Sequence, residues 1–170
     1  MVWPPEPMAT DTPPPYQPIP PDALAREARA LAAQGKRLVF TNGCFDLLHV
    51  GHVRYLQAAR ALGDRLAVAV NGDASVRALK GPGRPVTPEA ERAELLAALA
   101  CVDYVVLFHD KRVTELLRSV RPAVYAKGGD YTPETLDPEE RAALEEIGAE
   151  IRILALVPGR STTSILQSLS

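Results

Sequence analysis

Five short apolar runs, each bounded by polar residues, constrain the fold of this chain more than any other feature. Val, Leu, Ile and Ala dominate them, which is typical of strands buried on both faces of a sheet. We predict strands at residues 37–40, 65–71, 104–108, 123–126 and 151–157. Stretches with helical periodicity separate the runs. The sequence therefore predicts an α/β fold, a Rossmann-like five-stranded parallel sheet with helices on both faces.

Several predicted helices carry start signals. Asp22 is the expected N-cap of a leading helix over residues 23–33, and Thr87 is the expected cap of a helix over residues 87–100 that has Pro and Glu in its first turn. Ser161 is expected to cap a last helix. Further helices are predicted after His52 and at residues 73–79, 113–120 and 138–147.

The first 21 residues differ from the rest, because nine of the 16 prolines lie there. Such a segment cannot form a helix or a central strand, so we predict a disordered or extended tail over residues 1–21. A plain tail is favoured over a Pro-rich ligand, and we expect deletion of residues 1–20 to leave activity unchanged. One domain then covers residues 22–170, with its leading helix at 22–34.

Composition narrows the class of protein. A chain of 170 residues, 46% hydrophobic, can bury one core. The net charge of -2 and the absence of a basic tract argue against a nucleic-acid partner. The apolar runs are far too short to span a membrane, and the N-terminus lacks the pattern of a secretory signal. Cys44 and Cys101 are too few for a disulfide framework, so we expect a cytoplasmic protein with free thiols.

The segment from Thr41 to His52, TNGCFDLLHVGH, carries the clearest chemical signal. A strand feeds a Gly-containing loop that opens a helix, with His49 and His52 on its first turn. Unpaired N–H groups at a helix start favour anions, and imidazoles there can donate to phosphate oxygens. A metal site would need more ligands than these two, His109 and two scattered cysteines, and a structural histidine pair is the other alternative. The pattern favours a phosphate site.

Other polar motifs follow the remaining predicted strands. Asn42, Asn71, Phe108, Lys127 and Pro158 all lie at the carboxyl ends of strands. Because ligands bind outside these ends in open α/β sheets, the fold alone predicts a site there.

The segment His49-Val50-Gly51-His52 resembles the HxGH motif of the nucleotidyltransferase superfamily, which includes the cytidylyltransferase-like enzymes. Further stretches match in the same order: AVNGDAS (69–75), LKG (79–81), KGGDY (127–131) and STTSI (161–165). Together with TNGCFD they resemble the heptose-1-phosphate adenylyltransferase domains of bifunctional heptose-phosphate kinase/adenylyltransferases. The match runs from about residue 36 to the C-terminus, and no sugar-kinase domain precedes it in this sequence.

The resemblance implies transfer of AMP from ATP, with Mg²⁺, to a sugar 1-phosphate such as D-glycero-D-manno-heptose 1-phosphate. It assigns catalytic roles to His49, His52 and Lys80. It assigns nucleotide binding to Thr41, Asn42, Gly43, Phe45, Gly51, Arg92, Lys127, Gly128, Asp130, Ser161, Thr162 and Thr163. It assigns substrate binding to Asp46, Asn71, Arg84 and Tyr131, and Asp46 is also a candidate Mg²⁺ ligand. A homodimer is expected on resemblance alone.

Several alternatives stay open at this stage. Arg92 is almost as well interpreted as a surface residue flanked by glutamates, and Lys80 and Arg84 as a solvated loop. Cys44 is better interpreted as a packing residue than as a nucleophile. For the whole chain, the alternatives are a glycerol-3-phosphate cytidylyltransferase and a nucleotide-binding regulator without turnover. A class I aminoacyl-tRNA synthetase fragment would need a basic RNA-binding surface, which the sequence lacks.

Overall fold

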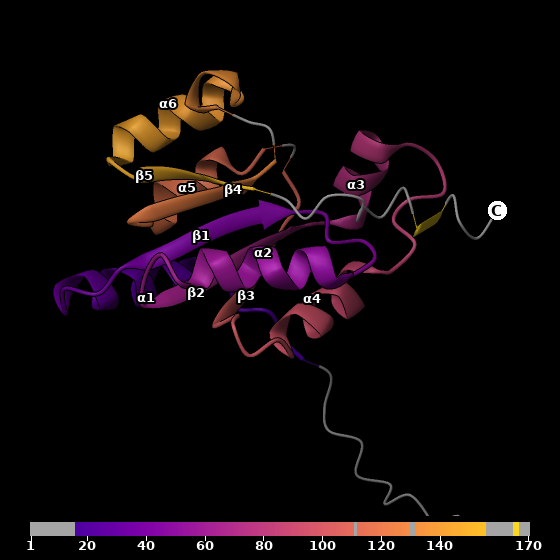
Figure 1. Cartoon of the computed structure of the whole chain (residues 1–170), viewed down its shortest axis with the longest axis horizontal. Coiled ribbons are helices and arrows are strands. Elements are labelled where there is room, and N and C mark those ends of the chain that lie inside the picture. The colour runs from indigo at the N-terminus through magenta and orange to yellow at the C-terminus, as the bar shows by residue number, and fades with distance from the viewer. Residues whose placement is uncertain (1–15, 111, 130–131, 156–164, 167–170) are drawn as a thin grey trace, which may run out of the picture.

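A computed structural model of the chain describes residues 16–110, 112–129, 132–155 and 165–166. Its sheet has five parallel strands in the order β3-β2-β1-β4-β5 (Figure 1). The strands are β1 (Leu38–Gly43), β2 (Arg65–Asn71), β3 (Tyr104–Phe108), β4 (Val124–Gly128) and β5 (Glu150–Leu154). The predicted parallel α/β sheet is therefore confirmed.

Helices cover both faces of this sheet, as predicted (Figure 1). They are α1 (Pro21–Ala33), α2 (Val50–Arg60), α3 (Asp73–Lys80), α4 (Glu89–Ala97), α5 (Thr114–Val120), α6 (Pro138–Ile147) and the short 3₁₀ helix η1 (Pro133–Thr135). One apolar cluster joins the sheet to α1, α5 and α6, and a second joins it to α2 and α4. Of the helix expected after Ser161, only residues 165–166 are described.

Two predicted helix caps are wrong. Asp22 lies inside the first turn of α1, where it pairs with Arg26 at 2.6 Å, and Pro20 occupies the N-cap position without a side-chain cap. α4 begins at Glu89 with Pro88 as its N-cap, so Thr87 lies just outside the helix. The backbone N–H of Thr87 instead donates to the Asp46 carboxylate at 3.0 Å. A cap signal in sequence cannot register such a long-range partner.

β1 is longer than the sequence predicted. Thr41, Asn42 and Gly43 belong to the strand and pair with residues 68–70 of β2, although we expected them in the loop. Polar side chains are tolerated there because β1 is the central strand, and its two neighbours can satisfy its backbone groups. The loop proper therefore begins at Cys44.

The order of strands reverses between β1 and β4. From β1 the chain builds β2 and β3 on one side, and then crosses to β4 and β5 on the other. Open α/β sheets bind ligands outside the carboxyl ends of the strands at such a reversal. Asn42 and Lys127 lie at this point, and Asn71 and Phe108 lie further along the same edge, as predicted. Pro158 is outside the described residues.

The residues before α1 cover the edge strand β3. The N–H of Ile19 donates to the Val105 carbonyl at 2.8 Å, and the Ile19 side chain packs against the cluster beneath α1. Burial raises the pKa of the Tyr16 hydroxyl, while a hydrogen bond with the Val105 backbone opposes the rise. Covering an edge strand removes exposed backbone groups that could pair with another chain. The predicted tail boundary at residue 21 is therefore too late, and residues 16–20 belong to the folded domain.

This packing changes the expected result of truncation. Deletion of residues 1–20 should lower the free energy of unfolding by about 1–3 kcal/mol, since it removes the Ile19 hydrogen bond and apolar contact area. Deletion of residues 1–15 keeps these contacts and should leave both melting temperature and activity unchanged. Thermal unfolding of the two truncated chains checks this, and equal melting temperatures would contradict the role of residues 16–20.

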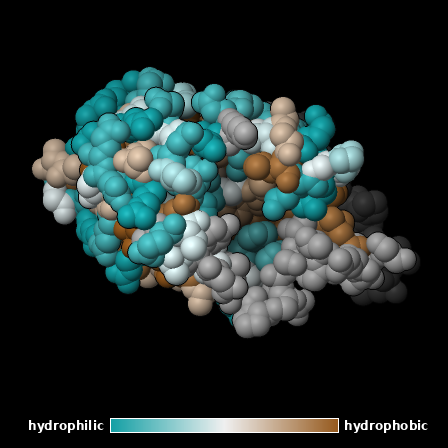
Figure 2. Space-filling view, turned by 90° about the horizontal axis from the view of Figure 1, so that it is seen from above, coloured by the Kyte–Doolittle hydropathy of each residue, from teal (hydrophilic) through white to brown (hydrophobic). Residues whose placement is uncertain are grey.

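The described surface offers few large apolar side chains. Figure 2 shows one face, mostly hydrophilic, on which apolar residues form small patches. The large apolar residues that are exposed are Val50, Leu79, Val86 and Leu95. None of the described helices is long and apolar enough to cross a membrane.

Candidate functional site

His49 and His52 lie together at the start of α2, as the sequence predicted. His49 is the N-cap residue, and its Nδ1 accepts a hydrogen bond from the Gly51 N–H at 3.1 Å. A neutral imidazole that accepts at Nδ1 carries its proton on Nε2, so His49 has a donor left for a ligand. The two imidazole rings stack, with centroids 3.9 Å apart and planes 24° from parallel.

Phe45 supports this pair from the preceding loop. Its ring meets His52 edge-on, with the centroids 5.3 Å apart. Phe45 has φ of 47°, a left-handed conformation that costs about 1–3 kcal/mol in a residue other than glycine. Phe45 is also buried, so its contacts hold this conformation. The structure thus places Phe45 against a histidine, whereas the resemblance suggested that it contacts the nucleotide.

The surroundings of His52 favour its neutral form. Burial and then the charge of His49 lower the pKa of His52 from 6.5 to about 4, while a hydrogen bond with the Leu47 backbone opposes the change. Among the described residues, His52 Nδ1 is buried and has no hydrogen-bond partner. At neutral pH this imidazole is therefore uncharged, and a ligand oxygen would find an unused polar atom beside it.

The low pKa of His52 predicts a pH dependence of stability. Between about pH 4 and pH 6.5 the unfolded chain binds a proton at His52 and the folded chain does not, so stability rises with pH across this window. Its full contribution, roughly 2–3 kcal/mol, is present above pH 6.5 and is lost as the pH falls towards 4. Urea unfolding of the wild type and of His52→Gln from pH 4 to pH 7.5 measures this. Parallel curves for the two proteins would contradict the prediction.

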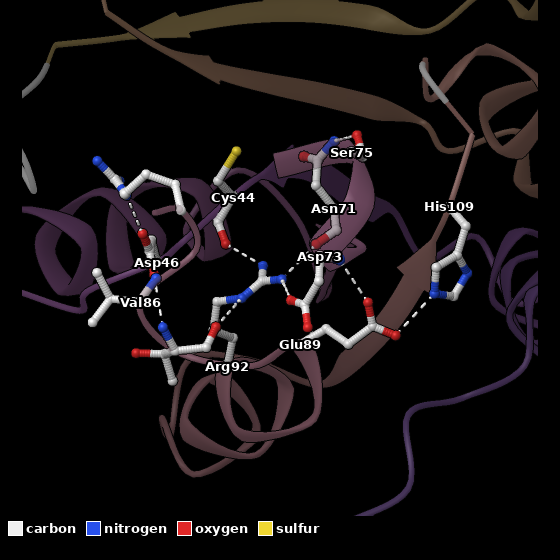
Figure 3. Close-up of polar contacts among 11 residues, drawn as sticks. Cys44, Asp46, Asn71, Asp73, Ser75, Val86, Glu89, Arg92 and His109 are labelled. Atoms are coloured by element: carbon white, nitrogen blue, oxygen red, sulfur yellow. Dashed lines mark hydrogen bonds and ion pairs between the residues drawn. The ribbon is translucent and has the colours of Figure 1, made fainter. Parts of the chain in front are cut away.

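Asp46 anchors a loop. Its Oδ1 accepts from the N–H groups of Val86 and Thr87 at 2.7 and 3.0 Å, and its Oδ2 accepts from Arg84 Nε at 2.5 Å (Figure 3). Asp46 is 2% exposed, and these hydrogen bonds hold the pKa of its carboxyl below the ordinary value against the opposing effect of burial. Both oxygens are thus occupied. The structure corrects the expectation that Asp46 binds substrate or metal directly and that Arg84 is a solvated loop residue.

Arg92 is a buried connector, and neither sequence interpretation of it was right. Its side chain is 0% exposed. The guanidinium donates to the carbonyls of Cys44 at 2.5 Å, Asn71 at 2.8 Å and Thr87 at 2.9 Å, and to Asp73 Oδ1 at 2.7 Å (Figure 3). It is neither a surface residue nor in reach of a ligand. It joins the loop after β1, the end of β2, the start of α3 and the segment before α4.

A second polar group surrounds the start of α3. Glu89 accepts from the Asp73 N–H at 2.7 Å, and its other oxygen lies 2.9 Å from His109 Nε2 (Figure 3). Gly72 is required between them, because a Cβ there would lie 2.4 Å from the His109 ring. Asn71 is buried, and its amide donates to Ser75 Oγ at 3.0 Å. Asn71 therefore supports α3, whereas the resemblance assigned it to substrate binding.

Polar side chains also meet between β1 and β4. Tyr125 Oη donates to Asn42 Oδ1 at 2.7 Å, and it lies 3.3 Å from Glu140 Oε2 and 3.4 Å from Lys127 Nζ. Thr41 is buried, and its hydroxyl pairs with Tyr55 Oη at 2.7 Å.

The tyrosine hydroxyl of Tyr55 also donates to the Ala126 carbonyl at 3.1 Å, so it ties α2 to both central strands. Burial raises the pKa of Tyr55 to about 12. Sequence analysis missed Tyr55, Glu89, Tyr125 and Glu140. Polar residues at the ends of predicted strands were a usable signal for Tyr125 only, since Tyr125 lies two residues before Lys127.

The remaining predicted residues fall into two groups. Lys80 is exposed at the end of α3, and its charge, together with those of Arg92 and Arg84, opposes the rise that burial causes in the pKa of the Cys44 thiol. Gly43 and Gly128 end β1 and β4. The others lie outside the described residues: Asp130, Tyr131, Ser161, Thr162 and Thr163.

The described residues do not form a ready metal site. No group of three or more His, Cys, Asp or Glu side chains among them could hold an ion. His109 lies beside Glu89 and not with His49 and His52, so the three histidines are not a ligand set. With the Asp46 oxygens also occupied, the protein groups described here do not fit a resident Mg²⁺ ion.

These features, a parallel sheet with a reversal of strand order and a histidine pair at a helix start beside it, define the class of protein. Residues 40–166 match the sequence profile of the cytidylyltransferase-like family, and the chain belongs to that family. This confirms the resemblance to the superfamily that the HxGH motif suggested.

Similar proteins narrow the comparison further. The bifunctional protein HldE of Geotalea uraniireducens (strain Rf4) is 53% identical over 148 residues, and that of Syntrophotalea carbinolica is 54% identical over 146 residues. These alignments cover 87% and 86% of this chain but only 30% and 29% of those proteins. A crystal structure of the lipopolysaccharide core biosynthesis protein from Thermoplasma volcanium GSS1 covers 72% of this chain and 98% of its own, with a TM-score of 0.60 and 29% identity.

Proposed function

We propose that the chain transfers AMP from ATP to a sugar 1-phosphate, with D-glycero-D-manno-heptose 1-phosphate as the acceptor. The stacked His49–His52 pair at the start of α2, beside the reversal of strand order, is the observation that carries this proposal. Support comes from the relatives named bifunctional protein HldE, to which about half of the aligned residues are identical. Because the chain spans less than a third of those proteins, the proposal concerns this domain alone.

The reaction needs no covalent enzyme intermediate. A phosphate oxygen of the sugar 1-phosphate attacks the α-phosphorus of ATP and forms a new P–O bond. The bond from the α-phosphorus to the oxygen bridging the β-phosphate breaks, and the electron pair leaves with pyrophosphate. Catalysis of such a step is mainly positioning and stabilisation of charge on the transferring group.

The histidine pair suits this task. The Nε2–H of His49 and the uncharged ring of His52 can donate to phosphate oxygens on which charge develops, and the first N–H groups of α2 point the same way. A low dielectric around half-buried rings strengthens such hydrogen bonds. Lys80, exposed at the end of α3, supplies a positive charge for the acceptor phosphate or for the departing pyrophosphate.

The other assigned residues take two kinds of role in this proposal. Asn42, Gly43, Gly51, Lys127 and Gly128 line the ends of β1 and β4 and the start of α2, where the nucleotide would lie. Thr41, Phe45, Asp46, Asn71, Arg84 and Arg92 hold these groups in place through the contacts described above. The proposed nucleotide contacts of Asp130, Ser161, Thr162 and Thr163, and the proposed substrate contact of Tyr131, rest on the resemblance.

A glycerol-3-phosphate cytidylyltransferase activity is the second candidate, and the family match favours keeping it. Pyrophosphate release with ATP or CTP, each tested against heptose 1-phosphate, other sugar 1-phosphates and glycerol 3-phosphate, distinguishes the two. We expect release with ATP and heptose 1-phosphate. Release only with CTP and glycerol 3-phosphate would replace the proposed substrates, and nucleotide binding without release from any pair would favour a regulator.

Mg²⁺ belongs to the proposal as the cation that accompanies the triphosphate, because Mg²⁺ is commonly bound through substrate phosphates with few protein carboxylates. A cytoplasmic location and a homodimer complete it. Both follow from the composition and the resemblance, and light scattering of the purified chain tests the dimer.

A further inference from the structure

Four polar side chains connect the interior of the domain to the carboxyl ends of β1 and β4. Tyr125 is 0% exposed, and its hydroxyl lies 2.7 Å from Asn42 Oδ1 and 3.4 Å from Lys127 Nζ. Glu140 of α6 is 8% exposed, and its Oε2 lies 3.5 Å from Lys127 Nζ. Asn42 and Lys127 end the two strands that flank the reversal of strand order. Tyr125 and Glu140 lie behind them, in the core.

The chemistry of these groups fixes the direction of the hydrogen bonds. The Lys127 ammonium can only donate, so it gives protons to Glu140 and to the Tyr125 oxygen. The Tyr125 hydroxyl has one proton, and its shortest contact is with Asn42 Oδ1. The hydroxyl therefore donates to the oxygen of the Asn42 amide. A rotated amide would instead bring two donor groups face to face.

With its oxygen held by Tyr125, Asn42 has its amide nitrogen directed elsewhere. The Nδ2 group makes no hydrogen bond with any residue that the structure describes, and it is not a buried atom without a partner. Asn42 Nδ2 and Lys127 Nζ are both hydrogen-bond donors, and both belong to the strand ends between which ligands bind in this kind of sheet. Such a pair is suited to anionic oxygens, and not to groups that themselves donate.

We infer that Tyr125 and Glu140 are positioning residues: Tyr125 orients the Asn42 amide as a donor to the phosphate oxygens of the nucleotide, and Glu140 holds the Lys127 ammonium beside it. The inference rests on the proposed function, because it takes the ligand between β1 and β4 to be a nucleoside triphosphate. Neither residue touches the ligand. Their contribution is to prevent the amide from rotating and the lysine from swinging away.

The test is direct binding of ATP, measured by calorimetry with Mg²⁺, for the wild type and Tyr125→Phe. The change removes only the hydroxyl, while the ring keeps its stacking against Phe40 at 6.5 Å. We expect the Kd for ATP to rise about tenfold, since one oriented charge-assisted donor is lost, with kcat within about twofold. Tyr104→Phe removes a hydroxyl that contacts only Glu27 on the surface, at 3.4 Å, and should change neither value.

A double-mutant cycle separates positioning from general loosening of the core. If Tyr125 acts through Asn42, Tyr125→Phe should raise the Kd by less than twofold in an Asn42→Ala background. A tenfold effect in both backgrounds would overturn the assigned route. Glu140→Gln keeps the shape of the side chain and should increase the Kd about threefold, through Lys127 alone.

The outcomes also separate this inference from the function on which it rests. If the wild type binds ATP and Tyr125→Phe binds it equally well, the inference fails while the proposed function stands. If the wild type binds no nucleotide, both fail together. Melting temperatures of all variants identify any change that merely unfolds the chain, and Asn42→Asp, which replaces the donor by a carboxylate of the same shape, then serves as the second test. It should weaken ATP binding at least tenfold.

Discussion

Replacing His52 by alanine should lower kcat by a factor of about 10² to 10⁴ while the Kd for ATP changes little. The neutral imidazole of His52 would donate to a phosphate oxygen mainly when charge builds up on it during transfer, so its contribution appears in the transition state. Pyrophosphate release at saturating substrates, together with ATP binding by calorimetry, measures the two quantities separately.

The control for this experiment is His109→Ala, the same change at the third histidine. His109 is 65% exposed and contacts Glu89, so its loss should alter kcat by no more than a few-fold. Because the His49 and His52 rings stack at 3.9 Å, the double variant should be little worse than either single one. Unchanged turnover in His52→Ala would remove the pair from the chemistry.

Replacing Arg92 by alanine should lower the free energy of unfolding by about 3–5 kcal/mol. The change leaves three backbone carbonyls and the Asp73 carboxylate without their donor in a buried place. For a chain of this size we expect the melting temperature to fall by roughly 10 °C. Thermal unfolding followed by circular dichroism measures the loss.

The matched control is Arg77→Ala, on the exposed side of α3, which should change stability by less than about 0.5 kcal/mol. Arg92→Lys should recover only part of the loss, because one ammonium cannot reach four acceptors that a planar guanidinium reaches together. Equal melting temperatures for Arg92→Ala and Arg77→Ala would contradict the buried role of Arg92. Activity should fall as well, because the Cys44 carbonyl belongs to the loop that carries the histidine pair.

The sheet and the histidine pair could be predicted from sequence because both depend on local patterns. Apolar runs identified the five strands, and the spacing of His49 and His52 after a glycine placed them at one helix start. Helix caps were less predictable. Thr87 has the right chemistry for a cap, but its N–H is taken by Asp46, which is 41 residues away in sequence.

The supporting residues could not be predicted, since their partners lie far along the chain. Arg92 stands among glutamates on an amphipathic helix, and only the fold brings it to Cys44, 48 residues away. Asp46 has the chemistry of a metal ligand, but the backbone of residues 86–87 reaches it first. Residues 16–20 follow many prolines, yet the edge of β3 gives them a hydrogen-bond partner that composition cannot reveal.

Transfer of radiolabel tests the central claim most directly. The wild type is incubated with Mg²⁺, heptose 1-phosphate and ATP labelled at either the α- or the γ-phosphorus, and the products are separated. We predict that the α-label appears in the nucleotide sugar and the γ-label in pyrophosphate. Label from the γ-phosphorus in the sugar would mean phosphoryl transfer instead, and with either label confined to ATP the proposed acceptor would be wrong.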